Sequence, residues 1–174
     1  MPLDIYLRTI PHTGTRFVCS LLDYLGVKYQ QWHIGWPEPP LFVDFDDVRV
    51  ALDVIPRVEG VTRYVVTARN PYETWESLKF DPRDWSNKCL EWHDELAELC
   101  ASKEMVFVFP LDTADRQRSI ADLAEFCGVE YDGHFNWDNG HLSGCQHGHC
   151  SEEVKEQLYG AYQWYRHHTL EVAA

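Results

Sequence analysis

The chain has 174 residues, of which 45% are hydrophobic, 14% aromatic and 25% charged, as in a folded globular domain rather than a disordered segment. Its 28 acidic and 15 basic residues give a net charge of −13, which argues against nucleic acid or an anionic membrane as a partner. The first residues lack the basic flank and apolar stretch of a signal peptide, and no segment resembles a membrane span, so we expect one cytosolic domain over residues 1–174.

Strand-like and helix-like segments alternate along the chain. Apolar β-forming residues predict strands at 4–10, 27–34, 62–68 and 105–109. Apolar residues at intervals of three and four predict helices at 17–25, 46–55, 85–101 and 114–127, with two more beginning near Pro71 and after Ser151. This order predicts an α/β fold of three layers, with helices on both faces of a mainly parallel sheet and ligands at the carboxyl ends of the strands.

Two short segments lie where a predicted strand leads into a helix. The first is PHTGTRF at residues 11–17, and the second is Arg69-Asn70-Pro71, with Ser77 eight residues after Arg69. A loop that runs into a helix offers unpaired backbone N–H groups and the positive end of the helix dipole, and both favour a phosphate or sulfate group. Because parallel strands end at the same edge of a sheet, we expect the two segments to form one local anion site.

These segments resemble those of the sulfotransferases that use 3′-phosphoadenosine 5′-phosphosulfate (PAPS). The first lacks the lysine of a Walker A motif, since Thr15 follows Gly14, and is similar to the family's PKSGTTW or KGGTR loop. The second reproduces the family's RNP and its spacing to a serine. A weaker likeness covers residues 106–128, which include an acidic turn and the sequence LAEFCG. The resemblance implies a short, divergent sulfotransferase with a P-loop NTPase-like fold.

The resemblance also implies roles for individual residues. Residues 13–16 would hold the 5′-phosphosulfate, Phe17 would lie near the adenine, and Arg69 with Ser77 would grip the 3′-phosphate. The implied cofactor-binding residues are Thr13, Gly14, Thr15, Arg16, Phe17, Arg69 and Ser77. His12 stands where the family has a lysine that stabilises the departing phosphate; a histidine can donate the same hydrogen bond, but its charge depends on pH.

The catalytic base and the acceptor are harder to place. His33, at the end of the second predicted strand, best fits the position of the base, with Glu38 and Asp44 as reserves; alternatively, His33 is a hydrogen-bonded core residue. The acceptor would be a small or glycan-like hydroxyl or amine. Aromatic residues could form its walls or belong to the core. They are Trp32, Trp36, Tyr72, Trp75, Trp85 and Trp92.

Two features leave alternatives open. The sequence CQHGHC at residues 145–150 could hold zinc, form a local disulfide or be an ordinary loop. The family's late basic loop is not evident, and the loop from Asn139 to Cys150 that could replace it has no lysine or arginine. A non-catalytic nucleotide- or anion-binding module is therefore an alternative to a metal-independent sulfotransferase, and a small kinase-like transferase is a third possibility that would require magnesium.

Overall fold

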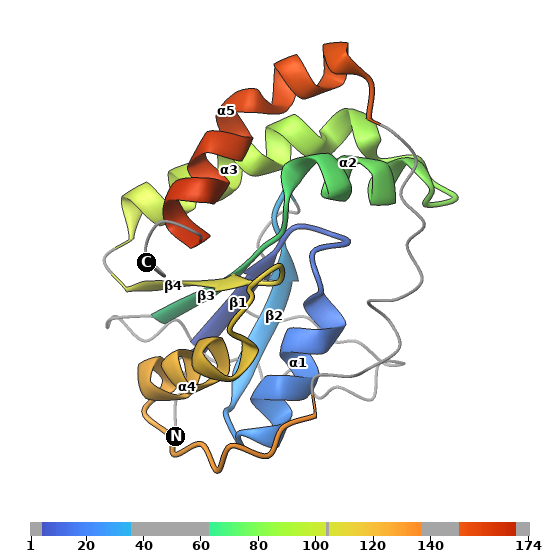
Figure 1. The fold of residues 1–174 in the computed structure, drawn as a ribbon. Helices are drawn as coiled ribbons and strands as arrows, with labels where there is room; N and C mark the ends of the chain where they lie inside the picture. The colour runs from blue at the N-terminus through green and yellow to red at the C-terminus, as the bar shows by residue number, and fades with distance from the viewer. Residues whose placement is uncertain (1–4, 36–62, 104, 137–149, 170–174) are drawn as a thin grey trace, which may run out of the picture.

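The computed structural model describes residues 5–35, 63–103, 105–136 and 150–169, and a four-stranded sheet lies at its centre (Figure 1). The strands are β1 Ile5–Thr9, β2 Tyr29–His33, β3 Arg63–Ala68 and β4 Val106–Pro110. They pair in the order β2-β1-β3-β4, and all three pairs are parallel. The predicted parallel sheet is confirmed for the part of the chain that the structure describes.

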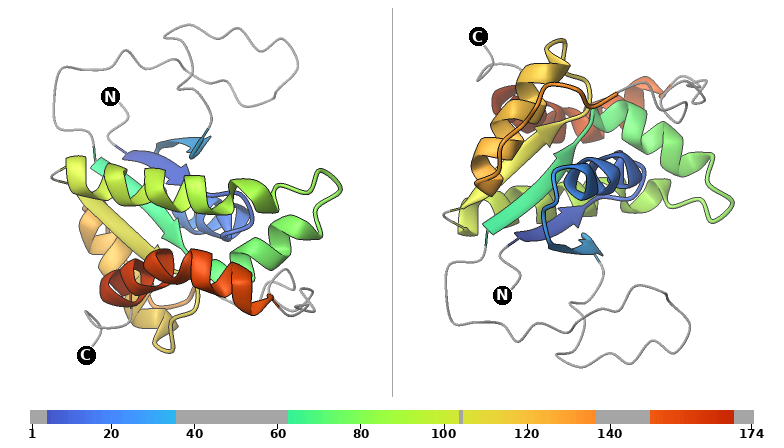
Figure 2. Two further views of the ribbon diagram at one scale, coloured as in Figure 1. Left: turned by 90° about the horizontal axis from the view of Figure 1, so that it is seen from above. Right: turned by 90° about the horizontal axis from the view of Figure 1, so that it is seen from below.

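Helices cover both faces of this sheet, which confirms the predicted α/β/α layers (Figures 1 and 2). One face carries α1 Thr15–Tyr24 and α4 Arg116–Cys127. The other carries α2 Pro71–Lys79, α3 Cys89–Ser102 and α5 Glu152–Thr169, with the short 3-10 helix η1 Ser86–Lys88 before α3. The predicted helix at 46–55 lies outside the described residues.

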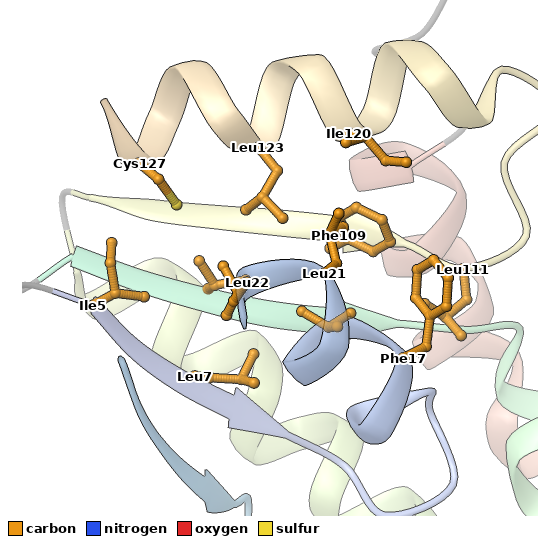
Figure 3. Close-up of a cluster of buried hydrophobic side chains, with 12 residues drawn as sticks. Ile5, Leu7, Phe17, Leu21, Leu22, Phe109, Leu111, Ile120, Leu123 and Cys127 are labelled. Carbon is orange, nitrogen blue, oxygen red and sulfur yellow. The ribbon is translucent and has the colours of Figure 1, made fainter. Parts of the chain in front are cut away.

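Each face has its own hydrophobic core, because neighbouring side chains of a strand point to opposite faces. On the first face, Ile5 and Leu7 of β1 pack with side chains of α1 and α4 (Figure 3). The buried residues of the second core are Ile10, Ile34, Val66, Leu78, Cys89, Trp92, Leu96 and Leu158. Tyr72, Trp75 and Trp85 are partly buried and pack against the second core.

Local sequence signals explain where α2 and α4 begin and end. Asn70 accepts a hydrogen bond from the Tyr72 N–H at 3.0 Å, and Pro71 occupies the first turn of α2, where its missing N–H costs nothing. Asp115 accepts one from the Arg118 N–H at 3.0 Å at the start of α4. Gly128 ends α4 in the left-handed conformation, with φ of 73°.

The strand order determines where a ligand would have access to the sheet. β2 lies on one side of β1 and β3 on the other; the connection from β1 to β2 runs through α1 on one face, and the connection from β3 to β4 runs through α2 and α3 on the opposite face. A crevice is expected at the carboxyl ends of β1 and β3, where the two connections diverge. The loop at residues 10–14 follows β1 and Arg69 follows β3, so both segments singled out in the sequence meet at this switch point.

Candidate anion-binding site

The amino terminus of α1 forms one part of the candidate site. Gly14 is the N-cap residue with φ of 79°, and no side chain of the described residues caps the first turn. A Cβ atom on Gly14 would lie 2.1 Å from Leu111 Cδ1, so both the left-handed backbone and the lack of space require glycine. Gly14 has no side chain that could cap the first N–H groups of α1, and these groups lie at the positive end of the helix dipole, as an anion site requires.

The imidazole of His12 joins the two sequence segments directly. Its Nδ1 lies 2.9 Å from Ser77 Oγ, and its Nε2 lies 2.8 Å from Asp81 Oδ2. The His12 backbone has φ of 66°, which is uncommon for a residue with a side chain. Arg69 donates from Nη1 to the His12 carbonyl at 3.1 Å and so helps to hold this conformation. The predicted meeting of the two segments is present at this point.

Asp81 is held on its other side by Arg83. The Arg83 Nε and Nη2 groups donate to Asp81 Oδ1 and Oδ2 at 2.8 and 2.9 Å, and the Arg83 backbone N–H donates to Oδ1 at 2.9 Å. These bonds hold the pKa of Asp81 well below its usual range. Because an ionised carboxylate only accepts hydrogen bonds, the facing His12 Nε2 must carry a proton.

Three arginines lie at this edge although the chain as a whole is acidic, with a net charge of −13; two of them are paired with carboxylates, Arg69 with Glu73 and Arg83 with Asp81. The side chain of Arg69 is only 13% exposed, and its Nε also donates to Glu73 Oε2 at 3.3 Å. Arg16 is exposed on the first turn of α1, and Arg83 is 59% exposed. An anion at this edge would thus meet guanidinium groups that come from three parts of the chain.

The hydroxyl groups of Thr13 and Thr15 serve the fold in this structure. Thr13 is fully buried; its Oγ1 donates to the Ile10 carbonyl at 2.6 Å and is hydrogen-bonded to Thr67 Oγ1. Thr15 Oγ1 donates to Thr9 Oγ1 at 2.9 Å. These bonds anchor the loop to β1 and β3, so backbone N–H groups rather than hydroxyls are the donors that the loop offers to an anion here.

His33 lies at the end of β2, close to the same loop. Its Nδ1 is 3.1 Å from Thr9 Oγ1 and 3.3 Å from the Thr9 carbonyl oxygen. Burial lowers the pKa of His33, and the positive charges of His12, Arg8 and Arg83 lower it further, against the opposing effect of the Thr9 backbone bond. A neutral imidazole near neutral pH is the form that a general base requires. The reserve candidates Glu38 and Asp44 lie outside the described residues.

Phe17 departs from the role that the resemblance implies. Its side chain is 4% exposed and belongs to the core between α1 and the sheet (Figure 3). The ring centroids of Phe109 and Phe135 lie 6.1 and 5.7 Å from that of Phe17. Its ring therefore has no exposed face on which an adenine could stack in this conformation, because the first turn of α1 directs it toward the sheet.

The acidic residues of the site were not found by sequence reasoning. Asp81 follows α2 in the sequence DPR, which matches no known motif and shows only that a turn is present. Asp112, in the turn after β4, accepts hydrogen bonds from the Asn70 N–H and from the Tyr165 hydroxyl, both at 2.8 Å. It therefore holds the start of α2 in place, next to Arg69.

Comparisons with known proteins add no family assignment: no family model matches the chain, and no curated protein is significantly similar to it.

Two further expectations concern metal and membranes. Among the described residues, no three potential metal ligands lie together, and Cys150 is a buried free thiol; the rest of the CQHGHC segment lies outside them. In the same part of the chain, no helix is both long and apolar enough to span a bilayer.

Proposed function

We propose that this protein is a sulfotransferase with a P-loop-like fold that moves a sulfuryl group from PAPS to a hydroxyl or amine. The observation that carries the proposal is the hydrogen bond between His12 and Ser77, beside Arg69 and the amino terminus of α1. It joins the two segments that resemble the family at the switch point of the sheet. A cytosolic location remains a prediction of the sequence.

The residues of the site suit the binding of a nucleotide with two separate anionic groups. The N–H groups at the start of α1 would hold the 5′-phosphosulfate, and Arg69 with Ser77 would bind the 3′-phosphate. A hydroxyl group can accept one hydrogen bond while it donates another. Ser77 can thus stay bonded to His12 while it donates to a phosphate oxygen.

The bound cosubstrate would supply an activated sulfuryl group, and the protein would position the reactants and move one proton. Both ring nitrogens of His12 already have partners. The positive charge of protonated His12, rather than a direct hydrogen bond, would therefore stabilise the oxygen between phosphorus and sulfur, where negative charge develops as the sulfur–oxygen bond breaks. His33 would take the proton of the acceptor as its oxygen or nitrogen forms the new bond to sulfur. No step in this scheme requires a metal.

A binding module without chemistry is the second candidate. It is favoured by the internal hydrogen bonds of Thr13 and Thr15 and by the burial of Phe17, because these three side chains contribute nothing to a ligand in this arrangement. Such a module would bind an anion at the start of α1 but would transfer no sulfuryl group.

Calorimetry with adenosine 3′,5′-bisphosphate (PAP), AMP and ATP, each with and without magnesium, tests the proposal. We expect binding that requires the 3′-phosphate and does not require magnesium. A preference for ATP with magnesium would instead indicate the kinase-like transferase, and failure to bind any of the three would overturn the nucleotide site. Transfer from PAPS to a panel of phenols, sugars and amines then separates the enzyme from the module.

A further inference from the structure

A hydroxyl, an imidazole and a carboxylate form a continuous chain of hydrogen bonds at the sheet edge. Ser77, His12 and Asp81 are linked by distances of 2.9 and 2.8 Å. The Ser77 residue is 8% exposed and the Asp81 side chain 6%, while the His12 side chain between them is 29% exposed. Arg83 orients the carboxylate by binding both of its oxygens.

We propose that Asp81, held by Arg83, is a positioning residue that fixes the His12 ring with Nε2 protonated and Nδ1 facing Ser77, so that anion binding at Ser77 is coupled to protonation of His12. An imidazole has two tautomers and can turn about its side-chain bond. A carboxylate facing Nε2 selects one of them. The ring is thereby held in a fixed orientation beside Ser77.

The coupling follows from the hydrogen-bonding capacity of the two groups. When His12 is neutral, its Nδ1 has no proton, so the Ser77 hydroxyl must donate to it and has no proton left for an anion. When His12 is protonated, Nδ1–H donates to Ser77 and the hydroxyl proton turns to the ligand. An anion that accepts from Ser77 therefore binds the protonated form better, and binding takes up a proton.

Charged and titratable groups from several elements lie near His12. Asp81 and Arg83 come from the turn after α2, and Arg69, which precedes α2, binds the His12 carbonyl. His33 on β2 lies close enough for the charge of His12 to lower its pKa. In the part of the chain that the structure describes, Asp81 is the only anion that contacts the ring, so the choice of tautomer is assigned to this residue.

Nuclear magnetic resonance with ¹⁵N-labelled histidine tests the first half of the proposal without any nucleotide. We expect the Nε2-protonated tautomer for neutral His12, with the signal assigned by His12→Gln. Asp81→Asn should shift the signal toward a mixture of tautomers, and Arg83→Gln, on a largely exposed side chain, should do so in part. The matched control Asp84→Asn changes a carboxylate that bonds only to Ser86 among the described residues and should leave the signal unchanged. An Asp81→Asn spectrum equal to that of the wild type overturns the proposal.

Calorimetry of PAP binding in two buffers of different ionisation enthalpy tests the second half, which rests on the anion site of the proposed function but not on sulfuryl transfer. In a series from pH 6 to pH 9, wild type should take up more protons per bound nucleotide than Ser77→Ala. Equal uptake in the two proteins would overturn the coupling.

If PAP does not bind, the proposed function fails, and the coupling is tested with sulfate instead. Sulfate binding to wild type and to Ser77→Ala is then followed through the His12 signal at pH 6 and pH 8. Sulfate binding that is tighter at pH 6 than at pH 8 in wild type, but not in Ser77→Ala, would support the coupling. Equal affinity of wild type for sulfate at the two pH values would overturn it.

Discussion

The Nδ1 atom of His12 lies 2.9 Å from the Oγ atom of Ser77, although the two residues are 65 positions apart in the chain. One belongs to the loop after β1 and the other to α2, which follows β3. The contact exists because β1 and β3 are neighbours in a parallel sheet and so end at the same edge. It makes both segments parts of one candidate site.

Replacing His12 should separate binding from transfer. His12→Ala should lower the rate of sulfuryl transfer by about 100-fold or more, because the positive charge beside the departing oxygen is lost. His12→Lys should keep or raise the rate, since an ammonium group carries the same charge and can pair with Asp81. Equal rates for wild type and His12→Ala, measured with saturating PAPS, would exclude His12 from the mechanism.

Replacing Arg69 should remove the preference for a 3′-phosphate. The loss of a charge-assisted hydrogen bond costs about 1.5–3 kcal/mol, which corresponds to roughly 10- to 150-fold weaker binding of PAP. The affinity for AMP, which lacks that phosphate, should differ less between Arg69→Ala and wild type than the affinity for PAP does. The control is Arg118→Ala, on an exposed side chain that pairs with Asp122 on α4. An unchanged ratio of PAP to AMP affinity in Arg69→Ala would contradict the assignment.

Gly14→Ala should destabilise the fold by several kcal/mol, because it adds the clash with Leu111 to the strain of a left-handed alanine, each costing about 1–3 kcal/mol. Gly133 provides a matched comparison, since its φ is 78° but a Cβ there would meet no atom within 4 Å. Gly133→Ala should therefore show the strain alone. Urea unfolding measures the free energy of unfolding of both variants. An equal loss of stability in the two would mean that Leu111 moves away without a cost in free energy.

The dependence of transfer on pH should reflect His33. A base must be unprotonated to take a proton, and burial lowers the pKa of His33 below its ordinary value. The rate should therefore stay level as the pH falls from 8 to about 6.5 and decline only at lower pH. His33→Gln should transfer more slowly by about 100-fold and lose this acidic decline. A His33→Gln enzyme with wild-type turnover would place His33 among the structural residues instead.

The elements that contain the two segments could be predicted because their signals are local. Asn70 and Pro71 mark the start of α2, and Gly26 and Gly128 mark the ends of α1 and α4, each through backbone chemistry that acts within a few residues. The direction of a side chain could not be predicted from such local signals. Phe17 was expected beside a ligand but is buried in the core, because the rotation of α1 against the sheet depends on packing with Phe109 and Phe135.

By itself, the sequence determined the alternation of strands and helices, the parallel sheet and the pair of segments at strand ends, since apolar periodicity and turn residues act over short stretches. Only the tertiary structure decided that Asp81 and Arg83 complete the site and that Thr13 and Thr15 turn inward. The physical reason is that these contacts join residues on different elements. Their formation depends on how the elements pack, which no local pattern in the sequence encodes.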